Sequence, residues 1–231
     1  MWEIIISSLP SLIEAMLKYT IPLALISFAF GMIIAIGVAL IKFLNPKING
    51  LLSIFWKLLR LVANFYVWIF RSTPLLVQLF IIFFGLPSIG IKLPPFTAAV
   101  IGFSLNTGAY GSETIRSALM SVSKDQWDAA YTLGFSTPQT LWRIIMPQAF
   151  RIVLPPLSNE FIGLVKDTSL ASTITIAEMF QVSQQIAAQN FQPLLMYVEV
   201  AALYAFLCTI LSVLQHYLEN RSSKFIKGDG N

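Results

Sequence analysis

The chain has 231 residues, of which 56% are hydrophobic and 11% are charged, and its formal net charge at pH 7 is +4. Soluble domains carry about 25% charged residues, so this composition indicates a protein of the lipid bilayer. A single cysteine excludes an intramolecular disulfide, and no metal-ligand cluster or GxxxxGK[ST] phosphate loop is present, so we expect no metal site and no ATP hydrolysis in this chain.

Five stretches, taken in chain order, are long and apolar enough to cross a hydrocarbon core of about 30 Å. Residues 2–17 come before them and resemble an amphipathic helix on the outer membrane surface, without the features of a signal peptide. The predicted spans are residues 19–41, 61–91, 93–116, 152–178 and 198–219. We therefore expect an all-α membrane protein with about five transmembrane helices, and one transmembrane domain over residues 1–231.

The basic residues predict the orientation. If the polar segment 120–149 is cytoplasmic, most lysines and arginines lie inside or at the inner interface, and only Lys18 and Lys92 lie outside. Such an excess of Lys and Arg in cytoplasmic loops is the usual pattern. Five crossings then put the N-terminus outside and the C-terminus in the cytoplasm. Membrane topology also explains the positive net charge without a nucleic-acid partner.

Segment 126–149 is a polar helical hairpin between the third and fourth spans. Its cap signals are Ser123 with Gln126, then Gly134, and then either Ser136 with Gln139 or Thr137 with Pro138. In the first helix, Trp127, Ala130 and Tyr131 fall on one face, spaced to meet a partner. A rigid and partly apolar element outside the bilayer indicates an adaptor rather than the lining of a pore.

The hairpin resembles the EAA loop of ABC-importer permeases, in which Glu-Ala-Ala is followed by three residues, Gly, nine residues and Ile-x-Leu-Pro. The residues at the matching positions are Asp128, Ala129, Ala130, Gly134, Ile144, Met146 and Pro147. Only Asp for Glu and Met for Leu depart from the pattern, and both changes are conservative.

Four further stretches are similar to signatures of the polar amino-acid uptake subfamily of these permeases. They are FRSTPLLVQ at 70–78, AYGSETIR at 109–116, LPPLSN at 154–159 and KDTSL at 166–170, with Ser72 where the subfamily usually has Gly. The resemblance implies a type I importer permease bundle in a bacterial or archaeal plasma membrane. It also implies the function: the transmembrane subunit of an ATP-driven importer of polar amino acids.

The resemblance implies three protein partners besides the lipid bilayer: an ABC ATPase that binds ATP and magnesium, an extracytoplasmic amino-acid-binding protein, and a second permease copy or paralogue. The hairpin is then expected to sit in a cleft of the ATPase, with Trp127 and Tyr131 as apolar anchors. Gly134 is expected to let the hairpin fold back closely. The expected coupling residues are Trp127, Asp128, Ala129, Ala130, Tyr131, Gly134, Ile144 and Pro147.

Polar residues inside the spans are candidates for the substrate path, because ionisable groups there usually face the bundle interior or a water-filled cavity. Counted at about 1.5 Å per residue from Arg60, Arg71 lies near mid-membrane, just before the helix-breaking Pro74. Both signs of charge suit a zwitterionic amino acid. The candidates are Arg71, Gln78, Asn106, Thr107, Tyr110, Glu160, Lys166, Asp167, Thr168 and Ser169.

Structural roles stay open for each of these residues, as ion pairs, caps or contacts at a dimer axis, whereas Glu113 is expected to pair with Arg116. The alternative function is a stand-alone ion-coupled carrier or channel for small solutes, which would use an ion gradient instead of ATP. Basic, acidic, amide and sulfur-containing amino acids, cystine among them, are all transported within the subfamily that the chain resembles, and all stay open as cargo.

Overall fold

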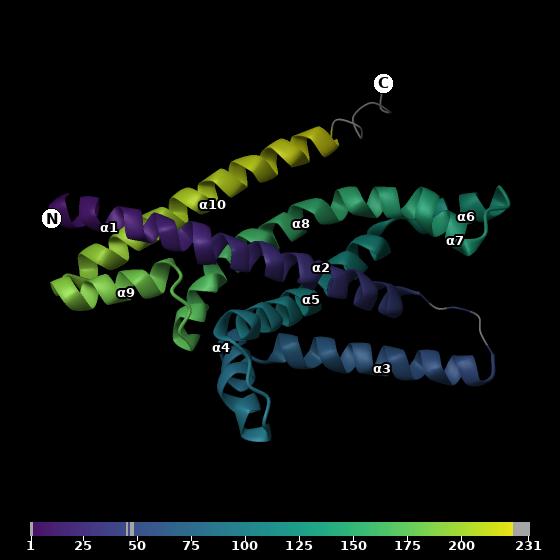
Figure 1. The fold of residues 1–231 in the computed structure, drawn as a ribbon. Coiled ribbons are helices and arrows are strands. Elements are labelled where there is room, and N and C mark those ends of the chain that lie inside the picture. Colours follow the sequence, from purple (N-terminus) through teal and green to yellow (C-terminus); the bar gives the residue numbers. More distant parts are fainter. Residues whose placement is uncertain (1, 45, 47–48, 224–231) are drawn as a thin grey trace.

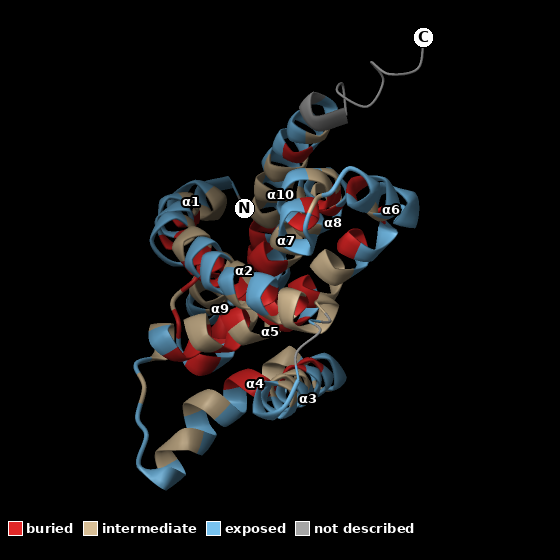
Figure 2. Ribbon diagram, turned by 90° about the vertical axis from the view of Figure 1, so that its right-hand side faces the viewer, coloured by how far each residue is buried: buried red, intermediate tan, exposed pale blue. Residues whose placement is uncertain are grey.

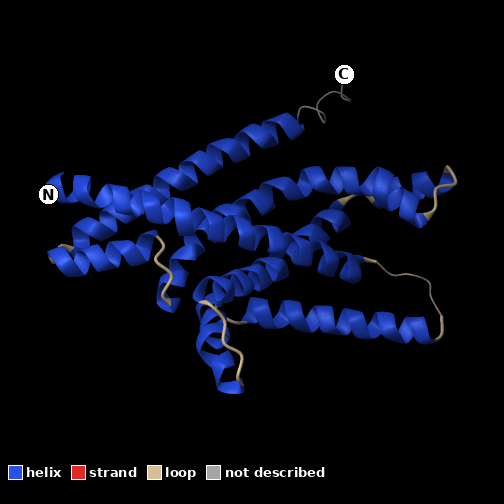
Figure 3. Cartoon of the chain, viewed as in Figure 1, coloured by secondary structure: helices blue, strands red, loops and turns tan. Residues whose placement is uncertain are grey.

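The computed structural model describes residues 2–44, 46 and 49–223, and these fold into helices joined by short loops, with no strand among them (Figure 3). Three helices of the described residues are apolar and long enough to cross a membrane: Trp2–Phe43, Leu51–Ser72 and Pro193–Asn220. Two further helices, which are less apolar, run through the same bundle: α5 (Pro95–Ser121) and α8 (Met146–Asp167) (Figure 1). The predicted all-α class is therefore confirmed.

The N-terminal segment differs from the predicted surface helix. α1 (Trp2–Ala15), a π-helical turn η1 (Met16–Thr20) and α2 (Ile21–Phe43) follow one another without a break, and they form one helix of 42 residues. Leu12 and Ala15 of α1 are buried against α9 (Met179–Asn190) and α10 (Pro193–Ser223). Because this face finds apolar partners within the protein, α1 extends the first apolar helix instead of lying apart from it.

The second predicted span, 61–91, is broken in the structure. α3 (Leu51–Ser72) ends before Pro74, and α4 (Leu75–Phe80) turns away from it and continues through η2 (Ile81–Gly85) and η3 (Leu86–Ile89) (Figure 1). Proline lacks an N–H and pushes the preceding residue out of the helical region, and Thr73 is accordingly extended. The 22 residues of α3 give about 33 Å, enough to cross the bilayer alone.

Small residues hold α2 and α5 close together at the centre of the bundle. On α2 they recur every three or four residues, and on α5 they include Gly108. A Cβ added at Gly31 would lie 2.9 Å from Thr107, and one at Gly108 would lie 2.8 Å from Ile34 Cγ2. Close backbone approach of this kind is how membrane helices gain packing without a hydrophobic driving force. The small residues of α2 are Ala24, Ser27, Gly31, Ala35 and Ala39.

The hairpin lies at one end of the bundle and α9 lies towards the other (Figure 1). It comprises α6 (Lys124–Thr132), α7 (Thr137–Thr140) and the π-helical turn η4 (Leu141–Ile145), which leads directly into α8. α8 therefore starts inside the predicted loop 120–149, and it passes into the 3₁₀ helix η5 (Thr168–Ile174) within the predicted span 152–178. Burial is concentrated along the central helices, while α3 and α6 are largely exposed (Figure 2).

Candidate functional site

The first helix of the hairpin begins where the sequence predicts. Ser123 is its N-cap, and the Ser123 hydroxyl accepts a hydrogen bond of 3.2 Å from the backbone N–H of Asp125. Gln126 stands at the capping-box position, but its side chain accepts a bond from the Gln148 amide at 3.3 Å. Gln126 thus connects α6 to the start of α8.

Gly134 ends the first helix in the left-handed conformation, with φ +83°. The N–H of Gly134 donates to the carbonyl of Tyr131 at 3.0 Å, and the N–H of Phe135 donates to the carbonyl of Ala130 at 3.1 Å. These two bonds close the helix end as a left-handed glycine cap does. A Cβ at Gly134 would meet nothing within 4 Å, so the backbone angle requires glycine and close folding of the hairpin does not.

Ser136 is the N-cap of the second helix, which decides between the two predicted caps. The backbone N–H of Ser136 donates to the side-chain oxygen of Gln139 at 2.9 Å, the reciprocal half of a capping box. Thr137 and Pro138 then occupy the first two helical positions. The two short helices are therefore each fixed by local caps.

One face of the hairpin attaches it to the membrane helices. The Trp127 ring lies 6.2 Å from the ring of Phe43 at the end of α2, centroid to centroid. Ala130 is buried, and Ile144 packs against the cluster formed by Leu119, Val122, Leu141, Ile145 and Ala149. Of the predicted coupling residues, Trp127, Ala130 and Ile144 thus face the body of the protein.

Other residues of the hairpin are exposed. Among the residues expected to couple, they include Asp128, Ala129, Tyr131 and Pro147. Two large apolar residues not singled out from the sequence are more exposed than Tyr131, whose exposed fraction is 44%: Leu133 at 76% and Trp142 at 61%. The sequence could have identified both residues, because they are large apolar side chains within a polar segment.

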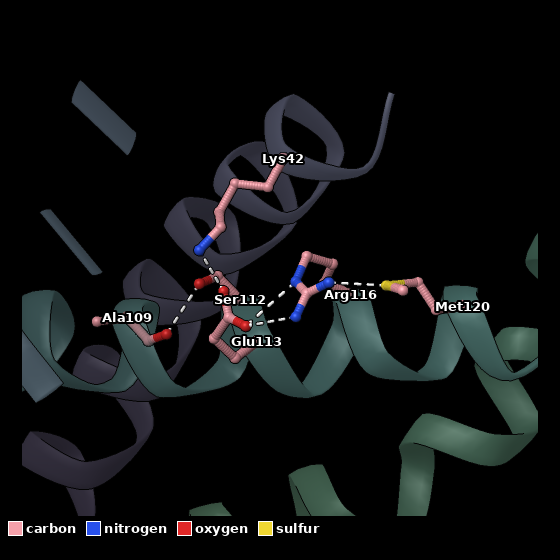
Figure 4. A network of polar contacts seen from close by, with 6 residues as sticks. All are labelled: Lys42, Ala109, Ser112, Glu113, Arg116 and Met120. Atoms are coloured by element: carbon pink, nitrogen blue, oxygen red, sulfur yellow. Dashed lines mark hydrogen bonds and ion pairs between the residues drawn. The ribbon is translucent and has the colours of Figure 1, made fainter. Parts of the chain in front are cut away.

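A charged network joins the end of α2 to α5 (Figure 4). Arg116 pairs with Glu113 at 2.9 Å, as predicted, and Lys42 of α2 pairs with the other carboxylate oxygen of Glu113. The network crosses between helices, which the local i, i+3 spacing of Glu113 and Arg116 does not reveal. It fixes the position of α2 against α5 close to where the hairpin attaches.

A polar cavity of about 370 Å³ lies between α5, α8 and the α3–α4 break. Five of the predicted path residues line it: Asn106, Thr107, Tyr110, Glu160 and Asp167. Glu160 and Asp167 are seven residues apart on α8, so both can face the same side. The remaining lining residues are Thr73, Pro74, Leu75, Gly163, Leu164 and Leu170.

Charged groups of both signs lie at or next to this cavity. Glu160 and Asp167 line it, and the Arg71 guanidinium lies over the ring of Tyr110 in its wall, 5.3 Å from the ring centroid. One oxygen of Glu160 accepts a bond from the Thr114 hydroxyl. The other is buried and has no hydrogen-bond partner among the described residues. Because Glu160 lines the polar cavity, its carboxylate is a candidate to bind a cationic group there.

Gln78 and Asn106 support the break between α3 and α4. The Gln78 amide donates to the carbonyls of Phe70 and Thr73, both at 3.0 Å, and so satisfies groups freed by Pro74. The Asn106 amide donates to the Gln78 side-chain oxygen at 3.0 Å. Of the two, Gln78 is buried at the break and only Asn106 reaches the cavity.

The other three predicted path residues lie elsewhere. Lys166 and Ser169 line a second cavity of about 470 Å³, against α9 and α10. Thr168 is fully buried, and its hydroxyl donates to the Val165 carbonyl at 2.7 Å. The sequence analysis grouped Lys166, Thr168 and Ser169 with Asp167 as one set of path residues. Because α8 ends at Asp167, these neighbouring residues point in different directions.

Comparisons with known proteins agree with this arrangement. Residues 48–224 match the family described as binding-protein-dependent transport system inner membrane component. The L-cystine transport system permease protein TcyB of Bacillus subtilis (strain 168) is 47% identical over 226 residues, covering 97% of this chain and 92% of TcyB. The glutamine transport system permease protein GlnP of Escherichia coli (strain K12) is 34% identical over 222 residues, covering 95% of this chain and 96% of GlnP.

Solved structures show the same fold. The crystal structure of an amino acid ABC transporter with histidines contains a chain with a TM-score of 0.85 and 31% identity, with 94% of this chain and 96% of that chain covered. An inward-facing structure of the MetNI methionine ABC transporter contains a chain with a TM-score of 0.74 and 18% identity, with 91% of this chain and 95% of that chain covered. Together with the family match, these findings show that the chain is a multi-pass membrane protein and belongs to the family of binding-protein-dependent transport system inner membrane components.

Proposed function

We propose that this chain is the permease subunit of an ATP-driven importer of polar amino acids. The observation that carries the proposal is that a single helix, α8, starts at the capped hairpin and carries Glu160 and Asp167 at the polar cavity. Pro147 and Glu160 are about 20 Å apart along this helix at 1.5 Å per residue. Neither a stand-alone carrier nor a channel needs a surface hairpin joined in this way to its cavity.

We propose that the hairpin transmits motion from a separate ABC ATPase, which binds ATP and magnesium. Its inner face is fixed by Trp127 and Ala130, so a push on the exposed face moves the hairpin as a unit. The exposed contacts would be made by Asp128, Ala129, Tyr131 and Pro147, with Gly134 keeping the hairpin closed. A second permease copy or paralogue and an extracytoplasmic binding protein would complete the importer.

The cavity is suited to a zwitterion. Arg71 offers a cation for the carboxylate of an amino acid, while Glu160 and Asp167 offer anions for its ammonium group. L-Cystine is the first cargo to test, because the relative TcyB is named for its transport and is 47% identical. Cystine carries two carboxylates and two ammonium groups, and both signs of charge are available here.

The proposal is tested with proteoliposomes that contain this chain, its ATPase and its binding protein. Radiolabelled cystine and other polar amino acids are offered outside, with ATP or a non-hydrolysable analogue inside. We expect uptake only with hydrolysable ATP, and no loss of uptake when ionophores collapse proton and sodium gradients. Uptake that ignores ATP and follows an ion gradient would overturn the proposal in favour of an ion-coupled carrier.

The role of Glu160 is tested with Glu160→Gln, which keeps an acceptor for Thr114 but removes the charge. Hydrogen bonds to charged groups contribute about 1.5–3 kcal/mol, so we expect the KM for uptake to rise about tenfold or more. Glu14→Gln is the matched control, because Glu14 is exposed and pairs only with Lys18 among the described residues. An unchanged KM in Glu160→Gln would remove this residue from the substrate site.

A further inference from the structure

Helix α3 carries a polar stripe that neither the fold nor the cavity uses in full. Lys57, Asn64 and Arg71 recur every seven residues and are all exposed, on a helix whose other exposed side chains are mostly large and apolar. Seven residues come within about 20° of two full turns, so the three lie on one face. We call Lys57, Asn64 and Arg71 the polar stripe.

Packing within the chain does not explain the polar stripe. α3 packs on α5 through the adjacent face, where Ala63 and Val67 are buried and the Tyr66 hydroxyl donates to the Leu105 carbonyl at 2.6 Å. Arg60, at the border of the two faces, donates to the Leu44 carbonyl at the end of α2. By contrast, no hydrogen bond or ion pair of Lys57 or Asn64 is found among the described residues.

Asn64 is the informative member, because lipid is a poor surrounding for it. It lies about 6 Å along α3 from Arg60, which the sequence places at the inner interface, and about 10 Å from Arg71 near mid-membrane, so it stands within the inner half of the bilayer. Burying an amide in an apolar medium without a hydrogen-bond partner costs several kcal/mol. Polar side chains at this depth usually face the bundle interior or a water-filled cavity.

The charges favour water over a second copy of the same helix. Lys57 and Arg71 are both cationic, and α3 contains no acidic residue. A two-fold axis that placed two such stripes face to face would oppose like charges. The stripe is also continuous with the polar cavity, because Arg71 lies over Tyr110 of the cavity wall. From there it runs towards the end of the bundle where α6 and α7 lie (Figure 1).

We infer that the polar stripe of α3 lines the inner half of the translocation path, with Lys57 and Asn64 bordering the water-filled route between the cavity and the cytoplasm. A wall of one sign of charge raises the local concentration of solutes that carry the opposite sign. The inferred route therefore suits a solute with a free carboxylate. The inference rests on the proposed function, since it assumes that the cavity opens inward.

The test compares two positions of similar depth on opposite sides of α3. Asn64→Cys and Val62→Cys are made in a Cys208→Ser background, which removes the only native thiol. Val62 is 56% exposed and lies about 160° from Asn64 around the helix. Each variant is reconstituted with its ATPase and treated, without ATP, with a charged membrane-impermeant thiosulfonate. Labelling is compared with that of the same protein denatured in detergent.

We expect Asn64→Cys to be labelled about tenfold or more faster than Val62→Cys, because the reagent attacks the thiolate, which an apolar surrounding disfavours. Equal and slow labelling at both positions, with full labelling after denaturation, would overturn the inference. So would an oxidant-induced disulfide that joins two copies of the Asn64→Cys variant without reagent labelling, which would place the stripe in a packed dimer contact.

The inference and the proposed function fail in different ways. Labelling needs no transport, whereas ATP-dependent uptake by the unlabelled Cys208→Ser background tests the function. If this background takes up amino acid and Asn64→Cys stays unlabelled, only the path assignment is wrong. If the background shows no ATP-dependent uptake while Asn64→Cys is labelled, the stripe faces water but the importer assignment is wrong.

Discussion

Gly134 shows how one backbone angle can control the hairpin. Its φ of +83° is unfavourable for any residue with a Cβ, although the surrounding space is open. We expect Gly134→Val to destabilise the end of α6 by about 1–2 kcal/mol, and Gly134→Asn to be better tolerated because Asn adopts left-handed angles more readily. The measurement is ATP hydrolysis stimulated by the loaded binding protein in the reconstituted importer.

The pair of variants separates backbone strain from contact. Asparagine is larger than glycine, so retained coupling in Gly134→Asn with loss in Gly134→Val would identify φ as the cause. Equal loss in both variants would instead indicate that the bound ATPase fills the open space around residue 134.

Two buried glutamates show that a carboxylate in this protein need not be functional. Glu199 accepts bonds from the Ser8 hydroxyl at 2.9 and 2.8 Å, and Glu178 caps α9 and accepts a bond of 2.6 Å from the Tyr204 hydroxyl. Both are satisfied within the fold. Glu160 differs because it lines the polar cavity and one of its oxygens is left without a hydrogen-bond partner in the described part of the chain, and its place in the cavity makes it a candidate for cargo.

The packing of α2 on α5 predicts a large difference between two glycines. A Cβ at Gly108 would lie 2.8 Å from Ile34 Cγ2, whereas one at Gly37 would meet nothing within 4 Å. We expect Gly108→Ala to destabilise the protein by about 1–3 kcal/mol through overpacking. Gly37→Ala should be neutral or stabilising by up to about 1 kcal/mol. Thermal unfolding in detergent measures both, and equal midpoints would contradict close packing here.

The hairpin predicts different effects for its two tryptophans. Trp127 packs on Phe43, so we expect Trp127→Ala to loosen the hairpin and lower the thermal stability of the isolated chain, by about 1–3 kcal/mol for a half-buried ring. Trp142 is 61% exposed, so Trp142→Ala should leave stability within about 0.5 kcal/mol. If Trp142 contacts the ATPase, its variant will retain less ATPase during affinity purification.

Retention of the ATPase by Trp142→Ala at the level of the unmodified chain would remove this residue from the proposed contact. Unchanged thermal stability of Trp127→Ala would contradict its role as the inward attachment of the hairpin.

Across the whole molecule, the distribution of basic residues predicts the orientation. With the hairpin inside, Lys18 and Lys92 are the only basic residues expected outside, and the C-terminus is cytoplasmic. A green fluorescent protein fused to the C-terminus should fluoresce, and alkaline phosphatase fused there should be inactive. An active C-terminal phosphatase fusion would reverse the orientation and move the hairpin away from any cytoplasmic ATPase.

The elements that the sequence predicted well are those whose cause is local. Hydropathy identified the apolar helices, and the caps at Ser123, Gly134 and Ser136 follow from the few residues around each of them. The predicted span 61–91 followed the hydropathy through Pro74, but α3 ends before this residue, which the sequence analysis had named as helix-breaking. The signal for that break, a proline preceded by a β-branched threonine, was present in the sequence.

The sequence by itself determined the all-α membrane class, the capped hairpin and the set of polar residues within apolar helices, because composition, periodicity and capping act over a few residues. Only the tertiary structure decided how those polar residues divide. Glu160 and Asp167 meet Asn106 and Tyr110 at one cavity, while Lys166 faces another beside α10. The tertiary structure also decided that Trp127 packs inward against Phe43. These outcomes depend on which helices become neighbours, and that is fixed by close packing between segments far apart in the chain.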